Sequence, residues 1–193
     1  MNHFFDVGAC IGQTFDNYLC KDDRHDGWTV WCFEPSLRHL PQLCSRLEAV
    51  KTRYSIVLCP FGLSGINTTA PFYVRAEDWQ GDSFSPNLYT LGQQERVSLK
   101  NLDAGYRLIA SMASLPDFIL AHTDPKDTIE LKLDCEGGEF TALPALLNCQ
   151  EALKRVSALL VEFHDNGPDW CWRMNRIKAG YAHAGKPIQD WNF

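Results

Sequence analysis

Two acidic residues follow an apolar run in the second half of the chain. Asp134 and Glu136 come directly after residues 129–133. Because an extended chain turns its side chains to alternate faces, this spacing predicts that both carboxylates lie on one side. Neighbouring carboxylates disfavour joint ionisation, so one can accept a proton from a hydroxyl while the other orients that hydroxyl. We therefore interpret Asp134 and Glu136 as candidate catalytic residues, with an acidic surface loop as the alternative.

A histidine follows the next apolar run, residues 156–161. By the same alternation Glu162 and His164 share a face, and a histidine can act as a general base near neutral pH. His164 is the candidate base after the two carboxylates, although a lone histidine is often a bystander. Glu139 begins the helix that is predicted directly after Glu136. A carboxylate at that position also simply stabilises the helix N-terminus.

The start of the chain carries an acid and two glycines. Residues 4–7 indicate a short buried strand that turns through Gly8 and Gly12 into a helix, and in α/β sheets such a turn forms the floor of a nucleotide pocket. A dinucleotide fold would show a third glycine. Here Asp6 precedes the turn and no lysine or arginine occurs before Lys21. A carboxylate repels phosphate and attracts cations, so S-adenosylmethionine fits better than NAD. An ordinary glycine-containing turn remains the alternative.

A second acid ends the second apolar run, residues 28–33. In nucleoside-binding α/β folds an acid about 20 residues after the glycine turn accepts hydrogen bonds from the ribose. Glu34 occupies that place and Pro35 ends the strand. A solvated acid at a strand end is the weaker alternative, given the acid and glycines before it.

Five segments resemble, in this order, the FkbM family of S-adenosylmethionine-dependent methyltransferases: residues 6–13, 33–35, 62–64, 114–118 and 131–139. The resemblance covers residues 4–165, and its most specific part is the Lys-x-Asp-x-Glu-Gly run that begins at Lys132. Two positions depart from the family: Cys10 stands where Asn is usual, and Pro116 where an acid is usual. The resemblance assigns these residues to cofactor binding: Asp6, Gly8, Ala9, Cys10, Ile11, Gly12, Gln13, Glu34, Pro35, Gly62, Leu63, Ser64, Asp82, Ser83 and Asp134. For Asp82 and Ser83 a surface turn is an equal alternative.

The resemblance also implies an activity, which is O-methylation of a hydroxyl, most often on a sugar or glycan. It implies a glycosyltransferase as a partner or as a fused domain. A divalent metal such as Mg²⁺ is a further candidate because acids cluster at the site, but no ligand set can be identified. Two other classes stay open. The first is an NAD-dependent enzyme, but the third glycine of its motif is missing here. The second is a non-catalytic interaction domain, and the joint presence of four acidic residues argues against it: Asp6, Glu34, Asp134 and Glu136.

Composition and charge predict a single domain. The 193 residues, 45% of them hydrophobic, are enough to bury a sizeable core, so we expect one domain over residues 1–193. The net charge of −6 argues against a nucleic-acid footprint, and no apolar run reaches the ~20 residues of a membrane span.

Eight scattered cysteines without a Cys-x-x-Cys motif indicate a reducing, cytoplasmic compartment and no structural zinc. Because Met1 lies so close to the first strand, we expect a domain excised from a longer polypeptide or a compact version.

The alternation of strands and helices predicts a doubly wound α/β domain with a mostly parallel sheet flanked by helices. The resemblance implies that this domain is a Rossmann-like class I methyltransferase. Ser36 is a candidate N-cap for a helix over residues 36–49, whose start Pro41 displaces by a turn. Residues 62–65 are expected to form a loop, and residues 71–74, 96–99 and 106–109 to form strands or loops. Residues 181–189 are expected to form a short C-terminal antiparallel hairpin. Candidate acceptor contacts are Trp79, Tyr89, Arg96 and Arg107.

Overall fold

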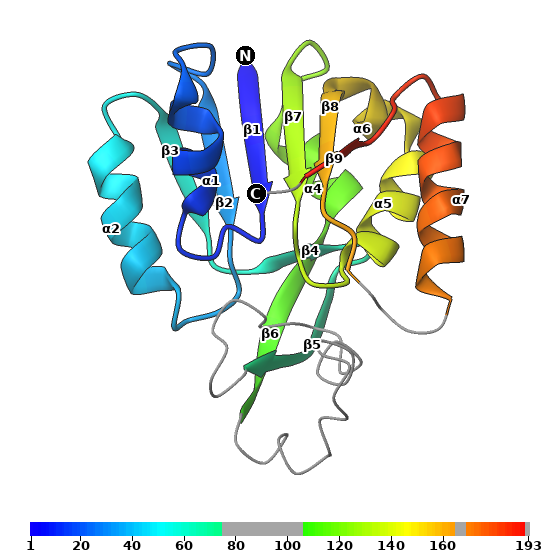
Figure 1. Cartoon of the computed structure of the whole chain (residues 1–193), viewed down its shortest axis with the longest axis horizontal. Coiled ribbons are helices and arrows are strands. Elements are labelled where there is room, and N and C mark those ends of the chain that lie inside the picture. The colour runs from blue at the N-terminus through cyan, green and yellow to red at the C-terminus, as the bar shows by residue number, and fades with distance from the viewer. Residues whose placement is uncertain (75–105, 165–168, 192–193) are drawn as a thin grey trace.

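A six-stranded parallel sheet lies at the centre of the computed structural model, which describes residues 1–74, 106–164 and 169–191. Helices cover both faces of this sheet (Figure 1). The strand order is β3-β2-β1-β7-β8-β9, and every neighbouring pair is parallel. The strands are β1 (Asn2–Val7), β2 (Thr29–Phe33), β3 (Ser55–Cys59), β7 (Thr128–Leu133), β8 (Val156–Val161) and β9 (Gln189–Asp190). The predicted mostly parallel α/β sheet is confirmed.

The order of the strands changes direction between β1 and β7. From β1 the chain adds β2 and β3 on one side, and it later adds β7 and β8 on the other. Such a point leaves a crevice at the carboxyl ends of the strands, where ligands bind in open α/β folds. The helices are α1 (Gln13–Asn17), η1 (Leu19–Lys21), α2 (Leu40–Val50), α4 (Leu115–His122), α5 (Glu139–Asn148), α6 (Gln150–Arg155) and α7 (Trp170–His183).

Side-chain alternation along the central strands divides the core into two halves. Phe5 and Val7 of β1 lie in a cluster with buried residues of α4, α5, α6 and α7. Phe4, on the opposite face of the same strand, packs with α1, η1 and α2. Because the central strands are buried on both faces, they are nearly continuous apolar runs. Asp6 and Lys132 are buried charged residues within these strands, and both belong to the site described below.

A second, three-stranded sheet lies beyond the carboxyl ends of the main one (Figure 1). Its order is β4-β6-β5, with β4 (Gly62–Ser64) parallel and β5 (Thr68–Val74) antiparallel to β6 (Tyr106–Ser114). Residues 71–74 and 106–109 are therefore paired strands. The expected loop at 62–65 is wrong, because buried Leu63 and its two neighbours pair with the end of β6. Residues 96–99 lie outside the described residues.

Helix α2 begins at Leu40, with Pro41 in its first turn, so the predicted displacement by proline is confirmed. Ser36 is not the N-cap. Its backbone N–H instead donates to Glu34 Oε1 at 2.7 Å. Residues 34–36 therefore continue from the end of β2 and are not part of helix α2.

The expected C-terminal antiparallel hairpin is wrong. Residues 181–183 continue α7, because Tyr181 is fully buried and its hydroxyl donates to the backbone oxygen of Leu143. Gly185, at φ +71°, then turns the chain, and the two-residue strand β9 joins β8 in parallel. Trp191 follows into the core on the opposite face. In the described part of the chain, no helix combines the length and apolar character required to cross a membrane.

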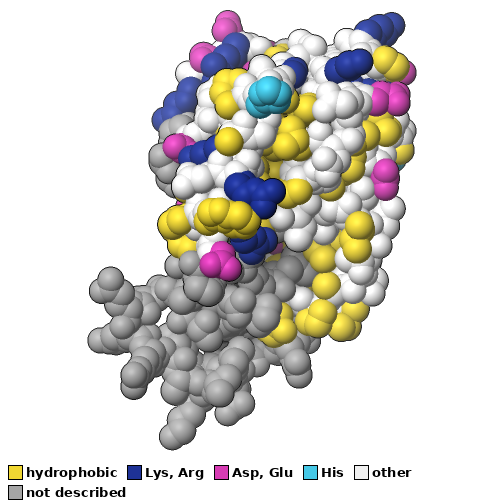
Figure 2. All heavy atoms as spheres, turned by 90° about the vertical axis from the view of Figure 1, so that its right-hand side faces the viewer, with side chains coloured by type: hydrophobic (Ala, Val, Ile, Leu, Met, Phe, Trp, Pro, Cys, Tyr) yellow, Lys and Arg dark blue, Asp and Glu magenta, His cyan; other side chains and the backbone are white. Residues whose placement is uncertain are grey.

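The face covered by α7 mixes basic and apolar side chains (Figure 2). Trp172 is exposed there, and the guanidinium of Arg176 lies 4.7 Å from the centre of its ring. The face therefore presents no uniform charge. The acidic groups described next lie at the strand ends instead.

Candidate active site

A cleft opens at the carboxyl ends of β1, β2, β7 and β8, at the point where the strand order changes direction. Many of the residues predicted for cofactor binding or catalysis line it: Gly8, Cys10, Gln13, Glu34, Pro35, Gly62, Leu63, Asp134, Glu136 and His164. Six further lining residues were not among the predicted site residues: Val7, Phe33, His39, Phe72, Cys135 and Glu162. The sequence motifs thus meet in one place, although more than a hundred residues separate the first from the last.

The turn after β1 is pressed between its two neighbouring strands. The backbone N–H groups of Gly8 and Ala9 both donate to the Phe33 oxygen at the end of β2, at 3.0 and 3.1 Å. On the other side, a Cβ at position 8 would lie 1.8 Å from the backbone oxygen of Asp134, and φ is +80°. Only glycine combines this φ with so close an approach. Gly12 is also left-handed, at φ +87°, and leads into α1.

The buried side chain of Lys132 contacts the glycine turn after β1 on the side away from the cleft surface. Its ammonium lies 3.0 Å from Asp6 Oδ1 and 3.3 Å from Asp134 Oδ2, and it donates to the Gly8 backbone oxygen at 2.8 Å. These three acceptors match the three donors of an ammonium group. Burial alone would lower the pKa of Lys132, but the carboxylates of Asp6 and Asp134 raise it above its usual value. Lys132 is therefore a buried cation that joins β1, β7 and the glycine turn.

Asp6 lies beneath the turn rather than on the surface of the cleft. It is fully buried, and Thr14 Oγ1 donates to its Oδ1 at 3.1 Å. With Lys132 on the same carboxylate, Asp6 positions the glycine turn and the start of α1. We assign it a positioning role.

Glu34 ties the glycine turn to the segment after β2. Its Oε2 accepts the N–H of Cys10 at 2.8 Å, its Oε1 accepts the N–H of Ser36, and His39 Nδ1 lies 3.4 Å from Oε1. Four lone-pair sites are available on a carboxylate, so Oε2 can accept a further hydrogen bond from a ribose hydroxyl. Burial opposes the charged imidazole, but hydrogen bonds with Cys10 and Glu34 raise the pKa of His39 to about 10.

The chain after β7 turns instead of staying extended. Glu136 has a left-handed φ of +53°, and Gly137 follows at φ +99°. The alternation argument for Asp134 and Glu136 was therefore wrong, yet the turn brings both carboxylates into the cleft. Glu139 holds this turn, because its buried carboxylate accepts the N–H groups of Cys135 and Gly137 at 2.8 and 2.9 Å.

His164 lies at the centre of the acidic groups. Its Nδ1 is 3.2 Å from Glu139 Oε1, and its Nε2 is 3.6 Å from both Asp134 Oδ1 and Glu136 Oε1. Burial lowers the pKa of the imidazole, but Glu139, Glu136 and Asp134 raise it to about 9. His164 is therefore a cation near neutral pH. Burial, and next the charge of Asp134, raise the pKa of Glu162.

The remaining predicted residues lie near the cleft without lining it. Ala9 borders a smaller pocket behind the turn, and Ile11 a shallow hollow beside α2. Gly12 packs against Arg46, and the hydroxyl of Ser64 lies 3.3 Å from that of Thr141. The side chains of Asp82, Ser83, Trp79, Tyr89, Arg96 and Arg107 lie outside the described residues.

The charges of the cleft favour a cationic nucleoside over a phosphate-bearing one. Among its described lining residues, carboxylates follow the ends of three strands, β2, β7 and β8, and no lysine or arginine occurs. The two histidines of the lining, His39 and His164, each lie against a glutamate, and the buried Lys132 behind the cleft already has three acceptors. A pyrophosphate would face carboxylates, whereas a sulfonium and an ammonium would be attracted to them. The residues present therefore fit S-adenosylmethionine.

Fold and cleft together define an α/β domain with a nucleoside-type pocket at the strand ends. A family model described as the methyltransferase FkbM domain matches residues 6–183. The chain belongs to this family of methyltransferases. A search of curated proteins gave no match.

The fold is similar to that of a solved structure, the methyltransferase FkbM from Methylobacillus flagellatus KT. The TM-score is 0.51 at 17% sequence identity, and the similarity covers 93% of this chain. It covers 38% of the other protein, so the chain spans well under half the length of that relative. This likeness supports the fold assignment.

Three residues important to the site were not predicted from the sequence. Lys132 was part of a recognised motif, but its role depends on the pairing that places it opposite Asp6 in the adjacent strand. Glu162 was placed on the face of His164 without a role. His39 carried no signal at all, because it sits at the start of a helix whose orientation only the fold determines.

Proposed function

We propose that this chain is an S-adenosylmethionine-dependent O-methyltransferase and that its acceptor is a sugar or glycan hydroxyl. The observation that carries the proposal is the cleft itself, in which Glu34 faces carboxylates across the ends of parallel strands without a described lysine or arginine in the lining. Family membership supports methyl transfer. The acceptor class rests on the family resemblance.

The chain's own residues would divide the work of binding. Glu34 Oε2 accepts a ribose hydroxyl, and the Gly8 turn lets the cofactor approach the backbone closely. Asp134 and Glu136 face the positive end of the cofactor. When bound, S-adenosylmethionine supplies the methyl group: the C–S bond breaks with its electron pair returning to sulfur, and a C–O bond forms. Holding the two reactants in line supplies most of the rate enhancement.

The proton released by the acceptor hydroxyl needs a base, and we assign this role to Glu136. Without a metal His164 is already protonated near neutral pH, so it is not the base. One carboxylate oxygen of Asp134, Oδ2, already pairs with the ammonium of Lys132, so we do not assign the base to Asp134. Glu136 is held in a left-handed conformation that a glutamate rarely adopts, and such strained residues cluster at active sites.

Calorimetric titration with S-adenosylhomocysteine tests the cofactor. We expect micromolar binding to the parent chain and at least a tenfold loss in Glu34→Gln, which keeps the size of the side chain but removes one acceptor. Glu48→Gln, on an exposed carboxylate, is the matched control. Absence of binding by the folded parent would contradict the proposal and favour the alternative, a non-catalytic interaction domain. Preference for NAD would favour the dinucleotide enzyme.

The cellular setting is also a proposal. All eight cysteines are free, which supports a reducing cytoplasmic compartment. A glycosyltransferase, separate or fused, would supply the glycan acceptor. Co-purification of the native protein with saccharide-transferring activity would support that partner, and recovery of the chain alone would count against it.

A further inference from the structure

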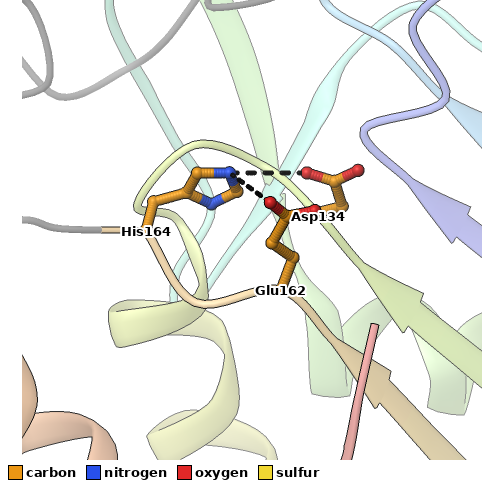
Figure 3. Close-up of side chains that lie close together, drawn as sticks. All are labelled: Asp134, Glu162 and His164. Carbon is orange, nitrogen blue, oxygen red and sulfur yellow. Dashed lines mark ion pairs between the residues drawn. The ribbon is translucent and has the colours of Figure 1, made fainter. Parts of the chain in front are cut away.

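Three metal-ligating side chains converge at the mouth of the cleft, from the ends of two neighbouring strands. Asp134 follows β7, whereas Glu162 and His164 follow β8 (Figure 3). One ligand atom from each, a carboxylate oxygen or an imidazole nitrogen, lies within 4.8 Å of the other two. All three residues are half-buried, so the point between them is reachable from the cleft.

Two of these side chains are held in place through their second heteroatom. Asp134 places Oδ2 against Lys132, which leaves Oδ1 directed toward the cluster. His164 places Nδ1 against Glu139, which leaves Nε2 directed toward the cluster. Lys132 and Glu139 are both buried, with exposed side-chain fractions of 2% and 0%. A carboxylate on the far nitrogen of a histidine is the usual device that orients a metal ligand.

The spacings between ligand atoms suit a shared ion better than direct hydrogen bonds. His164 Nε2 lies 3.6 Å from Asp134 Oδ1 and 3.8 Å from Glu162 Oε1, and both distances are too long for a hydrogen bond. Two atoms that each lie ~2.1 Å from one ion, at tetrahedral or octahedral angles, are about 3.0–3.4 Å apart. Small inward movements of His164 and Glu162 would bring the three atoms to that spacing.

We propose that Asp134, Glu162 and His164 form a binding site for one divalent transition-metal ion, with Mn²⁺ as the representative ion. An imidazole with two carboxylates is a mixed nitrogen and oxygen ligand set, which suits Mn²⁺, Fe²⁺ or Zn²⁺. Mg²⁺ prefers oxygen ligands throughout and retains its water. The ligand set thus differs from the all-oxygen magnesium site that clustered acids alone suggest.

The metal site is inferred from these three side chains alone, whereas its use in catalysis rests on the proposed methyl transfer. A metal at this point would bind the acceptor hydroxyl and lower its pKa. Glu136, whose Oε1 lies 3.6 Å from the same nitrogen, would then accept the proton. Three protein ligands leave positions for the acceptor, as in catalytic rather than structural metal sites.

Electron paramagnetic resonance of Mn²⁺ tests the site without any assay of activity. The full chain is titrated with MnCl₂ at pH 8, because a metal must displace the imidazole proton. We expect one bound ion per chain, and at least a tenfold loss of affinity in both His164→Gln and Glu162→Gln. His183→Gln and Glu151→Gln are matched controls, since both residues are exposed and distant from the cleft. Mg²⁺ added at the same concentration as Mn²⁺ should displace little of the bound Mn²⁺.

Several results would overturn the site. These are no Mn²⁺ binding by the folded parent chain, unchanged binding in a folded Glu162→Gln variant, or full displacement by equal Mg²⁺. Circular dichroism establishes folding, and Glu162, with 41% of its side chain exposed, is the substitution that disturbs the fold least. S-adenosylhomocysteine is titrated separately into chelator-treated protein. Binding of the cofactor product without Mn²⁺ binding would refute the metal site alone, whereas the reverse result would refute the cofactor alone.

Discussion

Lys132 Nζ lies 3.0 Å from Asp6 Oδ1, and the two residues are direct partners across the adjacent parallel strands β7 and β1. This ion pair joins the two acidic motifs of the chain. Through Lys132 the position of Asp6 under the glycine turn is coupled to that of Asp134 in the cleft. The strand-end motifs are thus one structural unit rather than separate contributors to a pocket.

Replacing Lys132 by methionine should destabilise the fold strongly. The variant leaves Asp6 buried without its cation, and breaking a buried ion pair in this way costs about 3–5 kcal/mol of unfolding free energy. Urea unfolding measures the loss. Lys178→Met is the control, because its ion pair with Asp190 is on the surface and should cost less than about 1 kcal/mol. Equal losses in the two variants would contradict the role assigned to Lys132.

Gly8 and Gly27 have nearly the same left-handed φ, +80° and +78°, but very different surroundings. A Cβ at Gly27 meets nothing within 4 Å, whereas one at Gly8 meets the Asp134 backbone oxygen. Gly27→Ala should cost about 1 kcal/mol from φ alone. Gly8→Ala should lose at least about 2 kcal/mol more and also weaken binding of S-adenosylhomocysteine, as measured by urea unfolding and calorimetry. Equal costs would show that the turn can move away from β7.

Local sequence patterns predicted most of the elements but not their long-range partners. Strand β8 occupies the predicted residues 156–161, since an apolar run between polar ends leaves little choice of boundaries. The partner of Asp6 depends on strand order, which no local pattern contains. The turn at Glu136 was missed because a glutamate gives no sign of a left-handed φ. The C-terminal hairpin failed because the burial of Tyr181 keeps α7 helical beyond the predicted end.

Replacing Glu136 by asparagine should separate stability from activity. Asparagine adopts the left-handed conformation more readily than other residues with a side chain, so the variant should gain about 0.5–1 kcal/mol of stability. Loss of the proposed base should lower the rate of S-adenosylhomocysteine formation with a saccharide acceptor about 10²- to 10⁴-fold. A rate that stays within twofold of the parent would remove Glu136 from the mechanism.

Cys10→Asn is the matched control for that variant, because Cys10 is also left-handed, at φ +49°. Asparagine is the residue that the family resemblance leads us to expect at this position. We expect a similar gain in stability, measured by urea unfolding. A loss of stability would mean that the contact between the thiol and His39 outweighs the backbone strain.

The charge on His39 should make the stability of the cleft depend on pH. Despite burial, hydrogen bonds with Cys10 and Glu34 raise the folded-state pKa to about 10, against about 6.5 in the unfolded chain. A raised pKa contributes stability that is complete below the unfolded value and is lost as the pH rises through the folded value. The parent should therefore be more stable than His39→Gln by about 2 kcal/mol at pH 6, the size of a hydrogen bond to a charged group. This difference should shrink between pH 7 and 10. Urea unfolding at several pH values, with His183→Gln as the exposed control, measures it; a difference that stays constant with pH would show that His39 is neutral in the folded protein.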